Sequence, residues 1–253
     1  MDQQSLIKQQ FGEMAQNYLT SPVHARGADL DKLAYLTNKL QPLRVLDLGC
    51  GAGHASFAMA SGGALNITAY DLSETMLAIV QNEAASRGFQ SITTCQGPVE
   101  RLPFENGLFD LIVTRFSAHH WQDMDAALAE IARVASPQGT LVVIDIVAPE
   151  VPLYDTVLQS VELLRDASHV RDYRLTEWKS MLEKKGFLWS DSFQWKLHLE
   201  FNSWITRIGT SLKRVEALKI TLDELPQEVK QYFCLGTDYS FSIDSAWIQA
   251  RRL

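Results

Sequence analysis

Short apolar runs alternate with longer amphipathic segments through the first half of the chain. The apolar runs have the length of buried strands and predict strands at residues 44–48, 65–70, 91–95, 109–114 and 140–147. Between them, helical spacing of apolar residues predicts helices at residues 54–61, 73–87 and 122–135, the last followed by a turn at residues 136–139. This alternation is typical of βαβ units, which build a parallel sheet.

More elements are predicted on both sides of this region. Residues 4–40 have the pattern of two helices separated at Ser21-Pro22. Later helices are predicted near residues 151–167, 175–185, 203–219 and 223–235, and late strands at residues 188–199 and 239–250. Residues 200–235 would then be an insertion between the last two strands.

Composition narrows the class of protein. With 253 residues, 46% hydrophobic and 21% charged, the chain suits one sizeable α/β domain. The net charge of −7 and the lack of a Lys/Arg cluster argue against nucleic acid as a partner. A polar N-terminus and the absence of an apolar run of membrane-spanning length favour the cytoplasm. Cys50, Cys95 and Cys234 are odd in number and widely spaced, so they suggest neither a disulfide framework nor a zinc site.

The first predicted strand runs directly into a glycine-rich turn, Asp47-Leu48-Gly49-Cys50-Gly51-Ala52-Gly53. Glycines allow a sharp turn and the close approach of a ligand, and the helix that follows offers free N–H groups to an anion. The dinucleotide fingerprint G-x-G-x-x-G would place its third glycine at His54, which is too bulky, or at Ser56. The pattern present is D-x-G-x-G-x-G, which favours a different nucleotide-like cofactor.

A second acid stands at the end of the second predicted strand. Asp71 follows Gly53 at close to the roughly 20-residue spacing at which an acid meets a ribose hydroxyl. A carboxylate suits a ribose because it accepts hydrogen bonds from both hydroxyls. Alternatively, Asp71 or Ser73 caps the next helix. Leu72 and Met76 could flank an adenine ring, and helical core packing would explain them equally well.

The glycine turn resembles motif I of the class I S-adenosylmethionine (SAM) methyltransferases, in which an acid precedes the glycines. In that family the turn faces the amino-acid part of SAM. The cofactor-binding residues that the resemblance implies here are Asp47, Gly49, Cys50, Gly51 and Gly53, with Asp71 on the ribose and with Leu72 and Met76 on the adenine.

A third segment is similar to the family's G-D-A-E-x-L-P-F motif. It reads Gly97-Pro98-Val99-Glu100-Arg101-Leu102-Pro103-Phe104. Pro98 replaces the aspartate that receives the adenine amino group, so that group must find another acceptor or water. The N–H group of Val99 could still donate to a ring nitrogen.

Residues 114–121, followed by Asp123, resemble the HH…D segment of the quinone-biosynthesis C-methyltransferases. The resemblance places the backbone carbonyl of Arg115 near the SAM ammonium group, and His119 and His120 where the acceptor enters. Because imidazole titrates near neutral pH, either histidine could accept a proton from a hydroxyl or an acidic carbon. Alternatively, one histidine hydrogen-bonds to this loop and the other packs beneath it.

The N-terminal residues resemble the lid of these relatives. Phe11 and Tyr18 share a helix face and could close over the cofactor, or simply pack the helix onto the domain. Aromatic and arginine residues further along could line an acceptor pocket for an aromatic or anionic small molecule, although tryptophan at such positions is often core. The candidate pocket residues are His24, Trp121, Arg171, Tyr173, Trp178 and Trp204.

These motifs together resemble the UbiE-like, type 11 methyltransferases, most strongly over residues 41–147. The implied fold is α/β, a Rossmann-like seven-stranded mostly parallel sheet with its last strand antiparallel. Residues 1–253 would form one domain, with a helical lid at 1–40, a SAM-binding core at 41–150 and substrate-side elements at 151–253.

The resemblance implies an enzyme that transfers the methyl group of SAM to a small molecule without a metal, with S-adenosylhomocysteine (SAH) as product. Two alternatives stay open. One is a catalytically silent SAM-binding module, because no residue of the sequence establishes an acceptor base. The other is a nicotinamide-dependent oxidoreductase of the Rossmann type, with which His54 conflicts.

Overall fold

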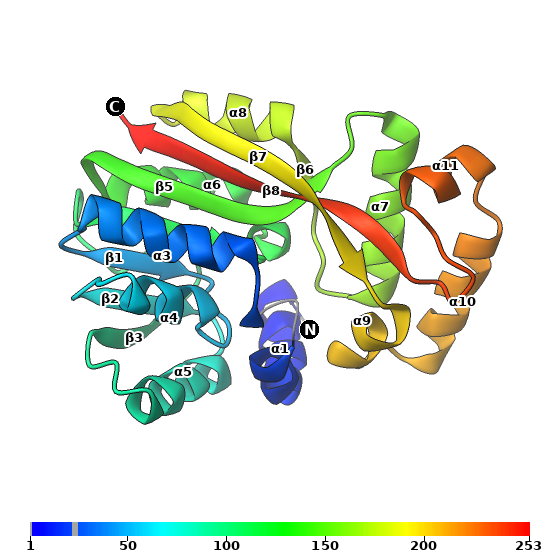
Figure 1. Cartoon of the computed structure of the whole chain (residues 1–253), viewed down its shortest axis with the longest axis horizontal. Coiled ribbons are helices and arrows are strands. Elements are labelled where there is room, and N and C mark those ends of the chain that lie inside the picture. Colours follow the sequence, from blue (N-terminus) through cyan, green and yellow to red (C-terminus); the bar gives the residue numbers. More distant parts are fainter. Residues whose placement is uncertain (1, 22–24) are drawn as a thin grey trace.

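The computed structural model describes residues 2–21 and 25–253. Its central sheet has the strand order β3-β2-β1-β4-β5-β8-β7, and a two-residue strand, β6, pairs with the end of β5 (Figure 1). The strands are β1 (Val45–Leu48), β2 (Ile67–Asp71), β3 (Ile92–Gln96), β4 (Phe109–Arg115), β5 (Ala135–Ala148), β6 (Tyr173–Arg174), β7 (Phe187–Leu199) and β8 (Phe241–Arg252). Of these, β8 runs antiparallel to both of its neighbours, β5 and β7. This confirms the Rossmann-like, mostly parallel sheet, whereas β6 is an addition to the seven predicted strands.

Helices connect the strands and cover the sheet. Those described are α1 (Gln3–Thr20), α3 (Ala28–Leu40), α4 (His54–Ser61), α5 (Glu74–Ser86), the 3-10 turn η1 (Ala118–His120), α6 (Met124–Val134), α7 (Pro152–Arg165), α8 (Leu175–Lys184), α9 (Phe201–Arg207), α10 (Leu212–Asp223) and α11 (Gln227–Tyr232). Polar residues fix where several begin, because a side-chain oxygen before the helix accepts a free N–H group of its first turn. Ser73 caps α5 in this way and Asp123 caps α6.

The sheet lies between two helical layers. Trp178 and Leu182 of α8 and Ile131 of α6 are fully buried against one face. Leu33 of α3 and Met59 of α4 are buried against the other. Both faces are thus covered, as parallel strands that are apolar on both sides require (Figure 1).

Two predicted elements differ most from those observed. Strand β5 begins at Ala135 rather than residue 140, because Ala135 already pairs with Phe109 before an irregularity in the register. The prediction of a turn at residues 136–139 was therefore wrong, since these residues belong to the strand. The helix predicted at residues 203–219 is two helices, α9 and α10. Gly209 lies between them with a φ of +71°, a left-handed conformation that ends a helix.

The late helices form a second apolar cluster beside the sheet. Leu158 of α7, Leu218 of α10 and Val229 of α11 pack with Phe241 and Ile243 of β8. The helices α9, α10 and α11 all lie between β7 and β8 in the chain, which confirms the predicted insertion.

Helix α1 packs against α5 and also contacts α9 (Figure 1). Tyr18 is buried together with Met76 and Ile79 of α5. The N-terminal helix therefore lies between the sheet side of the molecule and the late helices.

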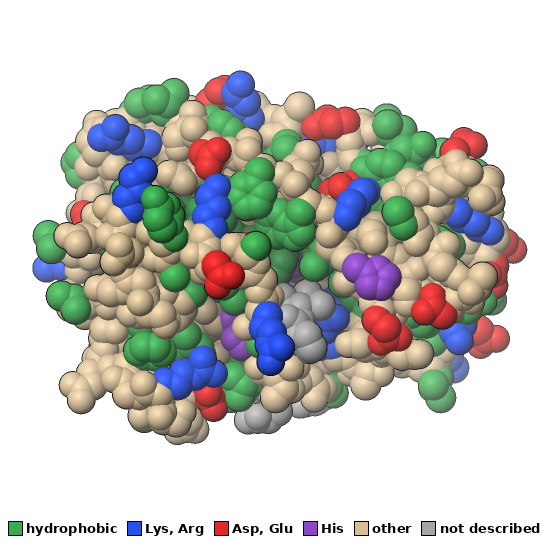
Figure 2. Space-filling model, in the orientation of Figure 1, with side chains coloured by type: hydrophobic (Ala, Val, Ile, Leu, Met, Phe, Trp, Pro, Cys, Tyr) green, Lys and Arg blue, Asp and Glu red, His purple; other side chains and the backbone are tan. Residues whose placement is uncertain are grey.

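Charged side chains of both signs are interspersed on the face shown in Figure 2. Among the described residues, none of the helices combines the length and the apolar character needed to cross a membrane.

Candidate cofactor and acceptor site

The glycine turn joins β1 to α4 and requires glycine at two positions for different reasons. Gly49 has a φ of +70°, and a Cβ there would lie 1.9 Å from Oγ of Ser117, so glycine lets the loop after β4 approach. Gly51 has a φ of +50°, and a Cβ there would meet nothing within 4 Å. Gly51 therefore leaves open space beside its backbone, where a ligand can approach.

That space is part of a cavity of about 1070 Å³, its open mouth included, at the carboxyl ends of the parallel strands. Ligands in open α/β sheets bind at this edge. The predicted cofactor residues that line it are Asp47, Gly49, Cys50, Gly51, Asp71, Leu72, Met76, Pro98, Val99, Arg115 and Tyr18. Gly53, the remaining one, precedes α4 and is not part of the cavity lining.

Asp47 brings a buried carboxylate to the cavity. Its Oδ2 accepts a hydrogen bond of 2.6 Å from the hydroxyl of Ser56, whereas its Oδ1 is buried without a hydrogen-bond partner among the described residues. Burial raises the pKa of Asp47 to about 6, even though the Ser56 hydrogen bonds oppose the shift. A cationic group in the cavity would offset the cost of this buried oxygen.

Asp71 connects the end of β2 to the glycine turn. Its Oδ2 accepts from the N–H of Gly51 and its Oδ1 from the N–H of Ser73, both at 2.8 Å. The side-chain cap of α5 is Ser73, which accepts from the N–H of Met76. Burial raises the pKa of Asp71, and the backbone hydrogen bonds oppose this rise. Each carboxylate oxygen retains a lone pair with which to accept from a hydroxyl.

Polar groups that the sequence interpretation did not single out lie near Pro98. The hydroxyl of Tyr70 donates to the Pro98 carbonyl at 3.0 Å. Glu100 accepts from the backbone N–H of Gln122, and both side chains line the cavity. Glu100 belongs to the quoted motif itself, which was the available signal for it. Glu100 and Gln122 thus supply polar side chains in the part of the cavity where Pro98 replaces an aspartate.

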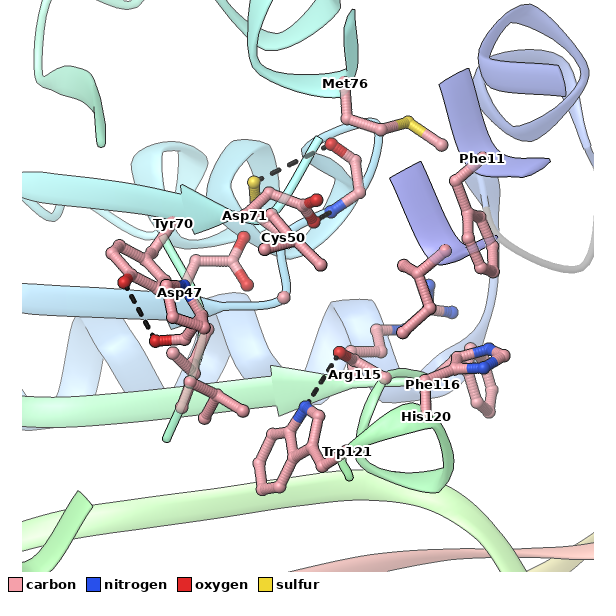
Figure 3. A pocket seen from close by; sticks show the side chains of 18 of the residues that line it. Phe11, Asp47, Cys50, Tyr70, Asp71, Met76, Arg115, Phe116, His120 and Trp121 are labelled. Atoms are coloured by element: carbon pink, nitrogen blue, oxygen red, sulfur yellow. Dashed lines mark hydrogen bonds between the residues drawn. The ribbon is translucent and has the colours of Figure 1, made fainter. Parts of the chain in front are cut away.

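Helix α1 covers one side of the cavity. The ring centroid of Phe11 lies 5.3 Å from that of Tyr18 and 5.0 Å from that of His120, the latter edge-on. Figure 3 shows Phe11 and His120 on one side of the pocket and Asp47 and Tyr70 on the opposite side. Gln3 also ties the helix down by donating to the carbonyl of Ser168 at 2.6 Å. His24 lies outside the described residues.

Arg115 ends β4 and carries a buried ion pair. Its Nε lies 2.5 Å from Oδ2 of Asp29 in α3, and both side chains are nearly inaccessible to water. The guanidinium also lies over the ring of Phe116, 4.7 Å from its centroid. Because the side chain is anchored in this way, the contribution predicted for Arg115 is limited to its backbone.

The two histidines of η1 have opposite electrostatic surroundings. Nδ1 of His119 lies 2.7 Å from Oδ1 of Asp145, whose other oxygen accepts the N–H of Ala118. Burial by itself lowers the pKa of His119, but Asp145 outweighs it and raises that pKa to about 9. Burial and the charge of His119 lower the pKa of His120 to about 4. Near neutral pH, His119 is therefore an imidazolium and His120 a neutral imidazole.

A second cavity of about 490 Å³, its open mouth included, shares part of its lining with the first. The residues that line both cavities, here called the throat, are Phe11, Tyr18, Phe116 and His120. His119 and Trp204 line only the second cavity, and Trp121 lines only the first.

Three residues predicted for the acceptor pocket line neither cavity, namely Arg171, Tyr173 and Trp178. Nη2 of Arg171 lies 3.3 Å from Oε1 of Glu177, and Trp178 is buried in the core. Two arginines that were not singled out, Arg165 and Arg207, line the second cavity instead. The signal for Arg165 was weak, a charged residue at the end of the apolar face of α7.

Comparison with known proteins agrees with this geometry. The Methyltransferase domain family matches residues 46–143. The uncharacterized protein YafE of Escherichia coli is 41% identical over 76% of this chain and 94% of its own. The uncharacterized methyltransferase YcgJ of Bacillus subtilis is 32% identical over 94% of this chain and 96% of its own. The crystal structure of YcgJ has a TM-score of 0.82 at 31% identity and covers 88% of this chain and 98% of that one.

A crystal structure of a Bacillus halodurans protein, with a TM-score of 0.85 at 29% identity, covers 89% of this chain and 99% of its own. Fold and matches together define a class I methyltransferase. The chain belongs to the type 11 family of SAM-dependent methyltransferases, as motif I and the His119-His120 segment indicated.

Proposed function

We propose that this enzyme transfers a methyl group from SAM, held in the larger cavity, to a small molecule that enters through the second cavity. The observation that carries the proposal is the throat, the set of residues shared by the linings of a nucleotide-sized cavity and of a smaller, partly apolar one. When bound, SAM supplies an electrophilic methyl group whose carbon–sulfur bond breaks as a lone pair of the acceptor bonds to the carbon, leaving SAH.

The residues of the larger cavity fit the chemical groups of SAM. The orphaned Oδ1 of Asp47 is a buried anionic acceptor suited to the ammonium group of the amino-acid part. Asp71 retains acceptor capacity for the ribose hydroxyls, and Leu72 and Met76 offer apolar contact for a ring. Glu100 and Gln122 supply polar side chains at the position where Pro98 cannot accept from the adenine amino group.

His120 is the better placed of the two histidines to orient an acceptor or receive its proton. It lies in the throat and is neutral near pH 7, whereas His119 already carries a proton. A neutral ring nitrogen can accept a hydrogen bond from an acceptor hydroxyl, and holding that group in line with the methyl contributes most of the rate.

Calorimetry with SAH and with NADH tests the cofactor. We expect SAH to bind and NADH not to, and tight binding of NADH alone would contradict the proposal. Incubation with labelled SAM and a panel of phenols, quinols and carboxylates then tests transfer. Binding of SAH with no labelled product from any member of the panel would favour a silent SAM-binding module.

A further inference from the structure

Two buried guanidinium groups line the second cavity. Arg165 ends α7 and Arg207 ends α9, and their exposed fractions are 9% and 8%. The carboxylate that lines the cavity beside them is that of Glu162, whose Oε2 lies 3.8 Å from Nη1 of Arg165. His119 adds a further positive charge to the wall near neutral pH. Among the described residues that line this cavity, cations therefore outnumber carboxylates.

Two further carboxylates lie behind the histidines. Asp145 is bonded to His119, and Asp166 lies 3.8 Å from His120 and accepts from the hydroxyl of Ser168. Neither aspartate lines the cavity. Asp145 compensates the charge of His119, whereas, against the opposing effect of burial, Asp166 together with Tyr18 and Glu162 raises the pKa of Arg165 and so keeps that guanidinium charged.

The positive charges of the two arginines repel each other. Burial and the nearby Arg165 lower the pKa of Arg207 to about 10, although Tyr18 and Glu162 act in the other direction. Burial also raises the pKa of Glu162, which weakens its value as a permanent counter-ion. An anion in the cavity would relieve this repulsion.

Apart from the charged groups and the throat residues, the cavity wall is apolar. This part consists of Ile146, Leu197, Leu199, Trp204 and Ile243. Arg165 is held in place by donating from Nε to the carbonyl of Trp204 at 3.1 Å, with its guanidinium 5.3 Å from the ring centroid. Such a wall suits a ligand with an apolar body and a charged end.

We propose that the methyl acceptor is a small carboxylic acid with an apolar body, anchored through its carboxylate by Arg165 and Arg207. A carboxylate matches the planar, forked donors of a guanidinium. Because both arginines line only the second cavity, the carboxylate is an anchor, and the atom that is methylated lies in the throat beside His120. This inference rests on the proposed function.

Binding to the wild-type enzyme loaded with SAH tests the inference without a variant. The probes are cinnamate and hexanoate, each compared by calorimetry with its uncharged amide of nearly equal shape. We expect at least one carboxylate to bind about tenfold or more tightly than its amide. Equal affinities for acid and amide, or no binding of either acid, would overturn the inference. Failure of SAH to bind would instead overturn the proposed function.

Variants then assign the preference to the two arginines. In Arg165→Met and Arg207→Met, the acid-over-amide preference should fall to within about twofold, while SAH affinity shows that the protein is folded. Arg207→Lys keeps the charge and should retain part of the preference. The exposed Arg44, which immediately precedes β1, provides the matched control Arg44→Met, which should keep the whole preference. A preference that survives in both arginine-to-methionine variants would contradict the assignment.

Discussion

His119 and Asp145 form a buried ion pair, with 2.7 Å between Nδ1 and Oδ1, and this pair makes two adjacent histidines chemically different. Asp145 stabilises the charged form of His119, and the resulting charge, together with burial, holds His120 neutral. The ring centroids of the two histidines are only 4.3 Å apart, which makes the effect strong. One Asp in β5 thus determines which histidine can accept a proton.

Because of this ion pair, we expect the protein to lose stability as the pH rises into the alkaline range. The pKa of His119 rises from an ordinary 6.5 to about 9 on folding, so its contribution is complete below pH 6.5 and is lost as pH rises through 9. Relative to His119→Gln, the free energy of unfolding of the wild type should fall by about 1–3 kcal/mol between about pH 6 and pH 10. Urea denaturation at several pH values measures this difference.

The matched control is His198→Gln, because His198 is exposed on β7. Its pH dependence should follow that of the wild type. Parallel curves for the wild type and His119→Gln would show that the Asp145 pair does not exist in solution.

His120 should matter for turnover more than for cofactor binding. Its replacement in His120→Phe keeps an aromatic ring in the throat but removes the ring nitrogen, so kcat should fall by about 10²–10³. Because burial and His119 lower its pKa to about 4, wild-type kcat/KM should be flat between about pH 6 and pH 8 and fall toward acid pH. An unchanged kcat with an otherwise normal SAH affinity would assign His120 to packing alone.

The site residues that the sequence predicted best are those whose position depends on local chain order. The glycine turn directly follows β1 and Asp71 is the last residue of β2, so their positions beside the cavity follow from the βαβ pattern. The arginines of the second cavity could not be found in this way. Arg165 and Arg207 come from different helices, and only the packing of α7 against the insertion brings them to one cavity.

The protonation states of the two histidines could not be predicted from the sequence either. His119 and His120 are neighbours in the chain and of one residue type, and the difference between them comes from Asp145 in a separate strand. The placement of Arg171 in the pocket failed for the same reason, because its partners in the fold could not be predicted from the aromatic residues around it in the sequence. Its side chain lies beside Glu177 and Asp155 instead.

The glycines of the turn should differ in what they tolerate. In Gly49→Ala the new Cβ would lie 1.9 Å from Oγ of Ser117, so we expect a loss of stability of about 2 kcal/mol or more. In Gly51→Ala only the left-handed strain of about 1 kcal/mol remains, and the main effect should be weaker SAH binding. Thermal unfolding and calorimetry separate the two effects.

Gly63→Ala is the control for Gly51→Ala. Gly63 also has a positive φ and open space around it, but it is not part of the cavity lining. It should lose a similar amount of stability and no SAH affinity. Equal SAH affinities in Gly51→Ala and Gly63→Ala would remove Gly51 from the cofactor site.

Asp71→Ala should weaken SAH binding by about 1–3 kcal/mol if the carboxylate holds the ribose. The loss has a second source, because Asp71 also accepts the N–H of Gly51 and so positions the turn. The control is Glu74→Ala, which removes an exposed acid from the first turn of α5. An affinity unchanged in Asp71→Ala would exclude the ribose role.

The buried pair of Arg115 and Asp29 predicts an asymmetry between single and double variants. Removing the guanidinium in Arg115→Met leaves the Asp29 carboxylate, which is 6% exposed, with its charge uncompensated, and should cost about 3–5 kcal/mol of stability. Adding Asp29→Leu removes that charge as well and should regain much of the lost stability. A double-mutant cycle in urea measures the coupling. Additive losses would mean that the pair contributes no coupling and that Arg115 acts mainly through its packing on Phe116.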